Sequence, residues 1–252
     1  MLCENTADLC NSHALPDALF RPMLQQGNGS AIVTSDDLTT PISRSSDTWS
    51  TPQLCADCEK LLNEECDSYG LAIFKGKKGR AARTPAGVSL QDVDAGKLRM
   101  FLLSVLWRMS VSTHSSYLNA QVPHVLREEL RATLLARGQY TASRLQVSLQ
   151  RLHDSTEVGG ITSEHFREVV MSPFIRKADK FYAVCFLIHG FLVQVYIPSL
   201  PVKFRRIFHV IEPRATVVFA PLLEFTKFPE LFALGVRSLH KINNGLSRLP
   251  HA

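Results

Sequence analysis

The residues best suited to chemistry near the start of this chain are cysteines. Cys55 and Cys58 are separated by two residues, a spacing that lets both thiols turn inward on one tight loop as half of a tetrahedral zinc site. A closed structural site takes four ligands, so the other half is expected from Cys3, Cys10 and His13. The alternative is a pair of free, buried thiols.

The order of these residues resembles the zinc-stapled branch of the HNH endonuclease superfamily, whose core is a β-hairpin and a helix around a metal. In that family a Cys-x-x-Cys precedes a strand with the catalytic histidine, a proline follows, and a second Cys-x-x-Cys precedes the helix. Cys3 matches the second thiol of the first pair, and His13 matches the histidine. Cys55 and Cys58 match the second pair, and the resemblance covers roughly residues 1–70.

The chain departs from this family pattern at three positions. The first thiol of the first pair is absent, so either the sequence begins too late, or Cys10 or His13 completes the zinc site. Catalytic members usually have Asp, Glu or His before the histidine, where this chain has Ser12. A histidine commonly follows the second pair, where this chain has Glu59.

The resemblance implies metal-dependent hydrolysis of nucleic-acid phosphodiester bonds, with His13 as the general base. It also implies structural Zn²⁺ on Cys3, Cys55 and Cys58. A catalytic divalent cation, Mg²⁺ or another, would have Glu59 as its ligand. The alternative is a non-catalytic zinc-stapled binding protein that retains the HNH scaffold. His13 decides between them, because a histidine nitrogen bound to zinc cannot accept a proton.

Composition indicates which class of partner and which cellular compartment to expect. The net charge of +5 is compatible with a nucleic-acid partner, although charge informs association rather than fold. The six cysteines lack the even spacing of a secreted disulfide framework, and no basic segment leads into an apolar run at the N-terminus. We therefore expect a cytoplasmic protein. The longest apolar run, residues 181–197, is shorter than the roughly 20 residues of a membrane span, so no membrane association is expected.

The elements that must position the candidate site lie in residues 1–74. We predict a strand and turn over residues 11–20, a return strand of the same hairpin over 31–34, and a loop over 35–52. A helix is expected over residues 59–69, beginning at the second cysteine pair. Together these elements would form an HNH-like, zinc-stapled ββα module.

A basic run, residues 75–80 with Arg83 beyond it, follows the predicted module. Its glycines and lysines indicate a flexible, solvated linker over residues 75–94. A loop that contacts phosphates is the equally weighted alternative.

Residues 95–252 are expected to form a second section of unassigned role. Apolar residues between Leu98 and Met109 recur at helical spacing, and a second helix is predicted over residues 123–137. The apolar run 181–197 predicts a buried hairpin that turns at His189-Gly190, followed by a strand over 214–220 and a helix over 229–240. The predicted fold class is α+β, an N-terminal ββα zinc module followed by a mixed helical and small antiparallel-sheet section.

Overall fold

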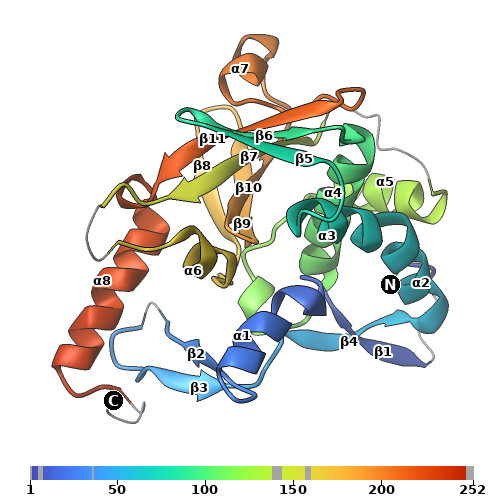
Figure 1. Cartoon of the computed structure of the whole chain (residues 1–252). Helices are drawn as coiled ribbons and strands as arrows, with labels where there is room; N and C mark the ends of the chain where they lie inside the picture. Colours follow the sequence, from blue (N-terminus) through green and yellow to red (C-terminus); the bar gives the residue numbers. More distant parts are fainter. Residues whose placement is uncertain (1, 5–7, 36, 138–143, 157–159, 248–252) are drawn as a thin grey trace.

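Helices and one large sheet make up the protein, which is α+β as the sequence predicted (Figure 1). The computed structural model describes residues 2–4, 8–35, 37–137, 144–156 and 160–247. The strands are β1 (Leu9–His13), β2 (Ala31–Val33), β3 (Ser43–Ser45), β4 (Ser50–Cys55), β5 (Arg80–Thr84), β6 (Gly87–Gln91), β7 (Gln146–His153), β8 (Phe174–Lys177), β9 (Tyr182–Ile188), β10 (Phe191–Ile197) and β11 (Val217–Glu224). The α-helices are α1 (Arg21–Gln26), α2 (Ala56–Leu62), α3 (Ser68–Phe74), α4 (Ala95–Val111), α5 (His124–Leu135), α6 (Ser163–Arg167), α7 (Val202–Ile207) and α8 (Pro229–Asn243).

The large sheet has seven strands in the order β5-β6-β11-β7-β10-β9-β8. Neighbouring strands are antiparallel except β11 and β7, which are parallel. The sheet is therefore mixed and larger than the small antiparallel sheet predicted from the sequence. The reason is that β5, β6, β7 and β8 were not recognised as strands.

Strands β9 and β10 form the predicted hairpin, with Ile188 opposite Phe191 and the turn at His189-Gly190. Both turn residues have positive φ, 50° and 76°, as a two-residue turn of this hand requires. Alternate side chains enter different cores: Val184 and Phe186 join the core around α4, whereas Cys185 joins one that includes residues of α6 and α8. Covering both faces explains why the run is apolar at nearly every position.

Helix α4 lies at the centre of the larger core. The sequence pattern indicated one apolar face, but both arginines outside that face, Arg99 and Arg108, are also buried, at 5% and 4% exposure. Trp107 is fully buried, as expected for an aromatic anchor. The helix is thus surrounded by protein rather than solvated on one side.

The hairpin predicted near the N-terminus has a different partner strand. β1 pairs with β4, with Leu9 opposite Cys55 and His13 opposite Ser50. The expected return strand, β2, pairs instead with β3. The predicted loop over residues 35–52 was therefore wrong in part, because β3 and the first residues of β4 lie within it.

Helices α2 and α3 follow β4 and are joined by a π-helical turn, η2 (Asn63–Asp67). The predicted helix over residues 59–69 is present and continues to Phe74. Gly70 brings α3 close to α4, because a Cβ atom there would lie 2.1 Å from the Phe101 ring. The start of this helical segment lies beside β1 and β4, and its end approaches the large sheet (Figure 1).

The prediction of a flexible linker over residues 75–94 is corrected by the structure. Strands β5 and β6 pair with each other, and β6 pairs with β11 at the edge region of the large sheet. One hydrophobic cluster contains Leu2 and Leu54 from the predicted module together with Leu102 and Val193 from the predicted second section. The two sections therefore share a core.

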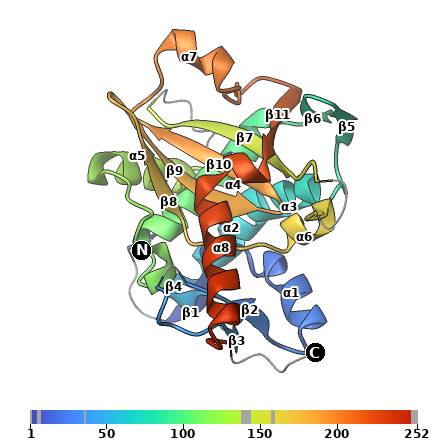
Figure 2. The ribbon, with the colours of Figure 1, turned by 90° about the vertical axis from the view of Figure 1, so that its left-hand side faces the viewer.

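Helix α8 connects the large sheet with the N-terminal strands, as both views show (Figures 1 and 2). Arg176 of β8 forms a two-bonded ion pair with Glu230 near its start, and Lys241 near its end donates to the Ser35 carbonyl at 2.8 Å. None of the helices in the described part of the chain combines the length and apolarity needed to cross a bilayer.

Candidate functional site

Three of the expected thiols come together at the junction of β4 and α2. Cys55 ends β4, Cys58 lies in the first turn of α2, and Cys3 approaches from the N-terminal segment. The sulfur atoms of Cys3 and Cys55 are 3.6 Å apart, and all three sulfurs lie within 4.8 Å of one another. Among the described residues, this is the only group of three or more Cys, His, Asp or Glu side chains close enough to share a metal ion.

Helix α5 holds the segment that carries Cys3. Arg131 donates from Nη1 to the Leu2 carbonyl at 2.8 Å and pairs through Nη2 with the Glu4 carboxylate at 2.9 Å. The Leu2 side chain on the same segment is 1% exposed. A helix from the predicted second section thus bonds the backbone before Cys3 and the side chain of the residue after it.

The thiol spacing fits a tetrahedral zinc ion. Zinc–sulfur bonds of about 2.3 Å at tetrahedral angles put two sulfurs about 3.8 Å apart, close to the separation of Cys3 and Cys55. Burial, and next the neighbouring thiols of Cys3 and Cys55, raise the pKa of Cys58 well above its usual range. Zinc binding would displace these protons, since thiolates are the ligands.

Neither of the two residues expected to complete the zinc site joins the three thiols. Cys10 and His13 both lie outside the group. The register of β1 gives the reason for His13: Leu9 is opposite Cys55, and His13 is four residues further along the strand. At about 3.3 Å per residue, this places His13 roughly 13 Å from the thiol end of the strand pair.

His13 is half-buried and faces polar groups. Its Nε2 lies 2.7 Å from the Thr48 hydroxyl and 3.9 Å from an Asp17 carboxylate oxygen. Burial lowers the pKa of His13, and the carboxylates of Asp17 and Glu59 oppose this shift in part. The ring is therefore mainly neutral at pH 7, which is the form that can accept a proton.

Ser12 and Glu59 are joined by a hydrogen bond. The buried Ser12 hydroxyl donates to Glu59 Oε2 at 2.8 Å, linking β1 to α2. In the described residues Glu59 belongs to no group of three ligand side chains, so the chain alone does not form a cage for a second cation there. A hard cation at this position would take most of its oxygen ligands from water or substrate.

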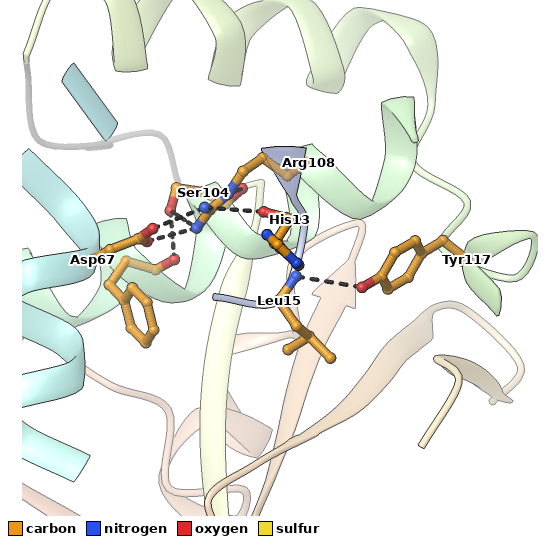
Figure 3. Close-up of polar contacts among 7 residues, drawn as sticks. His13, Leu15, Asp67, Ser104, Arg108 and Tyr117 are labelled. Atoms are coloured by element: carbon orange, nitrogen blue, oxygen red, sulfur yellow. Dashed lines mark hydrogen bonds and ion pairs between the residues drawn. The ribbon is translucent and has the colours of Figure 1, made fainter. Parts of the chain in front are cut away.

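A buried ion pair supports the strand end at His13, as Figure 3 shows. Arg108 of α4 donates to both carboxylate oxygens of Asp67, at 2.8 and 2.6 Å, and its Nη1 is 3.3 Å from the His13 carbonyl. The Tyr117 hydroxyl accepts from the Leu15 amide at 3.4 Å. The backbone on either side of the turn after His13 is therefore anchored by residues after position 94.

Sequence reasoning missed several of the residues that surround His13. Thr48 lies in the segment predicted as a loop and carries no motif. Arg108 gave a usable signal, because an arginine within a mainly apolar helix needs a polar partner if it is buried. Its partner, Asp67, could not be chosen among the carboxylates of the chain without the fold.

Comparison with known proteins gives no match: no family model, no curated protein and no solved structure resembles the chain significantly. The fold and the site define an α+β protein with a three-thiol cluster suited to a metal ion.

Proposed function

We propose that this protein is an HNH-like nuclease that hydrolyses nucleic-acid phosphodiester bonds with His13 as general base. The observation that carries the proposal is the separation of His13 from the three thiols. Its ring is bonded to Thr48 rather than committed to the cluster that would bind zinc. His13 can therefore act as the general base that the HNH resemblance implies.

In this proposal the thiols and His13 have separate tasks. Cys3, Cys55 and Cys58 would hold a structural Zn²⁺ that fixes the start of α2 against β4. When Nε2–H donates to the Thr48 hydroxyl, Nδ1 carries the lone pair that takes a proton from the attacking water. A divalent cation such as Mg²⁺, bound through Glu59 together with the substrate phosphate, would stabilise the leaving oxygen.

The test is a plasmid-nicking assay with added Mg²⁺ on the full-length protein, its His13→Ala variant and a His124→Ala control. His124 is exposed at the start of α5 and has no part in the site. Loss of a general base lowers the rate by about 10²- to 10⁴-fold. We expect His13→Ala to lose cleavage by that factor with its zinc content unchanged, and His124→Ala to cleave normally.

A second candidate function is a zinc-stapled protein that binds nucleic acid without cutting it. The bond from Ser12 to Glu59 favours it, because the carboxylate expected to hold the catalytic cation already has a protein partner. In this case the wild-type protein contains zinc and binds DNA in a salt-dependent way, yet nicks no plasmid at any Mg²⁺ concentration. That result would overturn the nuclease proposal.

A further inference from the structure

A cavity of about 150 Å³ lies at the opposite end of the α2–α3 helical segment from the thiols. It is lined by the end of α3, the β5–β6 hairpin, β7, the end of α6 and the β9–β10 turn; Figure 1 shows the β5–β6 hairpin beside α3. Its apolar walls come from Ile73, Phe74, Val88, Leu90 and Phe191. Its polar lining is basic, from Lys75, Arg83, Arg151, Arg167 and His189. We call it the basic pocket.

The positive side chains of the basic pocket have few carboxylate partners. Among the described residues, one ion pair involves them: Arg167 lies 3.7 Å from Glu164. Burial, then the charges of Arg167 and Arg83, lower the pKa of Arg151 to about 10. These residues come from three separate parts of the chain, so their gathering is a product of the fold and not of a basic stretch of sequence.

Arg151 is the fixed centre of the basic pocket. It is 6% exposed, and it donates from Nη1 to the His189 carbonyl at 2.8 Å and from Nη2 to the Ser163 carbonyl at 3.1 Å. The guanidinium carbon lies 4.9 Å from the centre of the Phe191 ring. In the described part of the chain no carboxylate lies within 4.0 Å of this guanidinium, so its direct contacts are with carbonyl oxygens and a ring face, and Glu164 acts on its charge only from further away.

Gly190 makes room for this guanidinium. A Cβ atom at that position would lie 2.4 Å from Arg151 Nη1, and the backbone φ of +76° also favours glycine. The β9–β10 turn thus holds the Arg151 head group in place. A rigid guanidinium loses little freedom when it binds an oxyanion.

We propose that the basic pocket binds the phosphate group of a small phosphate ester. A phosphate offers several oxygens and up to two negative charges to converging guanidinium and ammonium groups, which suits arginine donors in particular. The volume is below the roughly 300–1,000 Å³ of pockets that enclose a whole drug-sized ligand. The pocket therefore takes the phosphate group, and the remainder of the ester lies outside it.

In this proposal, part of the basic run at residues 75–83 contributes to phosphate binding. Lys75 and Arg83 line the basic pocket, whereas Arg80 pairs through Nε with Asp92 at 2.8 Å. Arg80 and Arg83 lie on opposite faces of β5, since side chains alternate along a strand. The same strand therefore supplies both a pocket arginine and a matched control outside it.

The experiment is isothermal titration of the full chain with two phosphate probes, inorganic phosphate and ribose 5-phosphate, and with an oligonucleotide that has no terminal phosphate, each at constant ionic strength against sodium chloride. We expect saturable binding of both probes. The double variant Arg83→Ser/Arg167→Ser should bind at least tenfold more weakly, and Arg80→Ser should stay within twofold of wild type. Neither variant changes Arg151, so the hydrogen bond from Arg151 to the turn stays in place.

Three results would overturn the proposal: no saturable binding of either probe, equal weakening in Arg80→Ser, or binding only of an oligonucleotide that has no terminal phosphate. The last would assign the charges to a nucleic-acid backbone. The proposal is independent of the nuclease proposal. We expect His13→Ala to bind inorganic phosphate as the wild-type protein does, so either proposal can fail without the other.

Discussion

At the scale of single residues, the thiols are the part of the molecule with the most definite chemistry. Cys3, Cys55 and Cys58 lie within 4.8 Å of one another, whereas Cys10 on β1 lies outside this group. We expect Cys58→Ser to lose bound zinc and Cys10→Ser to retain it, measured as zinc per chain by mass spectrometry after purification. Zinc loss in Cys10→Ser with retention in Cys58→Ser would show that the ion lies elsewhere.

His189 makes stability depend on pH. Burial, then the charges of Arg167, Arg151 and Lys75, lower its pKa to about 4, below the value of about 6.5 in an unfolded chain. Between these values the unfolded chain binds more protons. The contribution of His189 to stability is therefore complete above about pH 6.5 and is lost as the pH falls toward 4.

The measurement for His189 is the urea midpoint at pH 7, 6 and 5. Wild type should lose stability across this range, and His189→Asn should lose less, because asparagine does not titrate and tolerates the positive φ of the turn. The same pH dependence in both proteins would mean that other groups cause it.

At the scale of elements, the Arg108–Asp67 pair joins α4 to the π-helical turn η2 and to the strand end at His13. Both side chains are buried, at 5% and 10% exposure. Removing one partner leaves an uncompensated buried charge, which costs about 3–5 kcal/mol. We expect Asp67→Ala and Arg108→Met each to lower the free energy of unfolding by that amount.

The control for this pair is the exposed ion pair of Arg80 and Asp92, at 75% and 63% exposure. An exposed pair contributes about 0–1 kcal/mol, so Asp92→Ala should have little effect in the same urea titration. The double variant Asp67→Ala/Arg108→Met should lose less than the sum of its single variants, because it leaves no lone charge. Additive losses would contradict a direct coupling between the two side chains.

At the scale of the whole molecule, residues on both sides of the expected linker share one hydrophobic cluster. Trp49 packs edge-on against Phe20 and Tyr117, and Trp107 lies inside α4. The two tryptophans therefore report on the N-terminal part and on the central helix. The Trp49→Phe and Trp107→Phe proteins each keep one tryptophan. We predict that in each variant the urea midpoint from tryptophan fluorescence equals the midpoint from circular dichroism, because both parts of the chain unfold together.

Removal of zinc should affect both parts of the chain in the same way. A ligand present at 100 times its dissociation constant stabilises the folded state by about 2.7 kcal/mol. Chelation should then lower the midpoints of both fluorescence probes together. A chelator that shifts only the Trp49 signal would show that the N-terminal part unfolds independently of the central core.

The sequence by itself determined the features that depend on neighbouring residues. The hairpin at His189-Gly190 follows from two β-rich runs separated by residues that accept positive φ, and the structure confirms it. The helices over residues 95–111 and 124–135 follow from apolar periodicity. The Cys55-Ala56-Asp57-Cys58 knuckle is likewise local, and the approach of Cys3 to it was expected; zinc binding itself stays a prediction.

Only the tertiary structure decided which distant segments meet. β1 pairs with β4 and not with β2, because short strands have similar local preferences and the choice between partners is made by packing against α2 and the shared core. The partner of Arg108, Asp67, lies 41 positions away, and Arg151 in the basic pocket bonds the carbonyl of His189, 38 positions away. Such contacts leave no periodic signal in the sequence, since each residue's type shows its need for a partner but not where that partner lies.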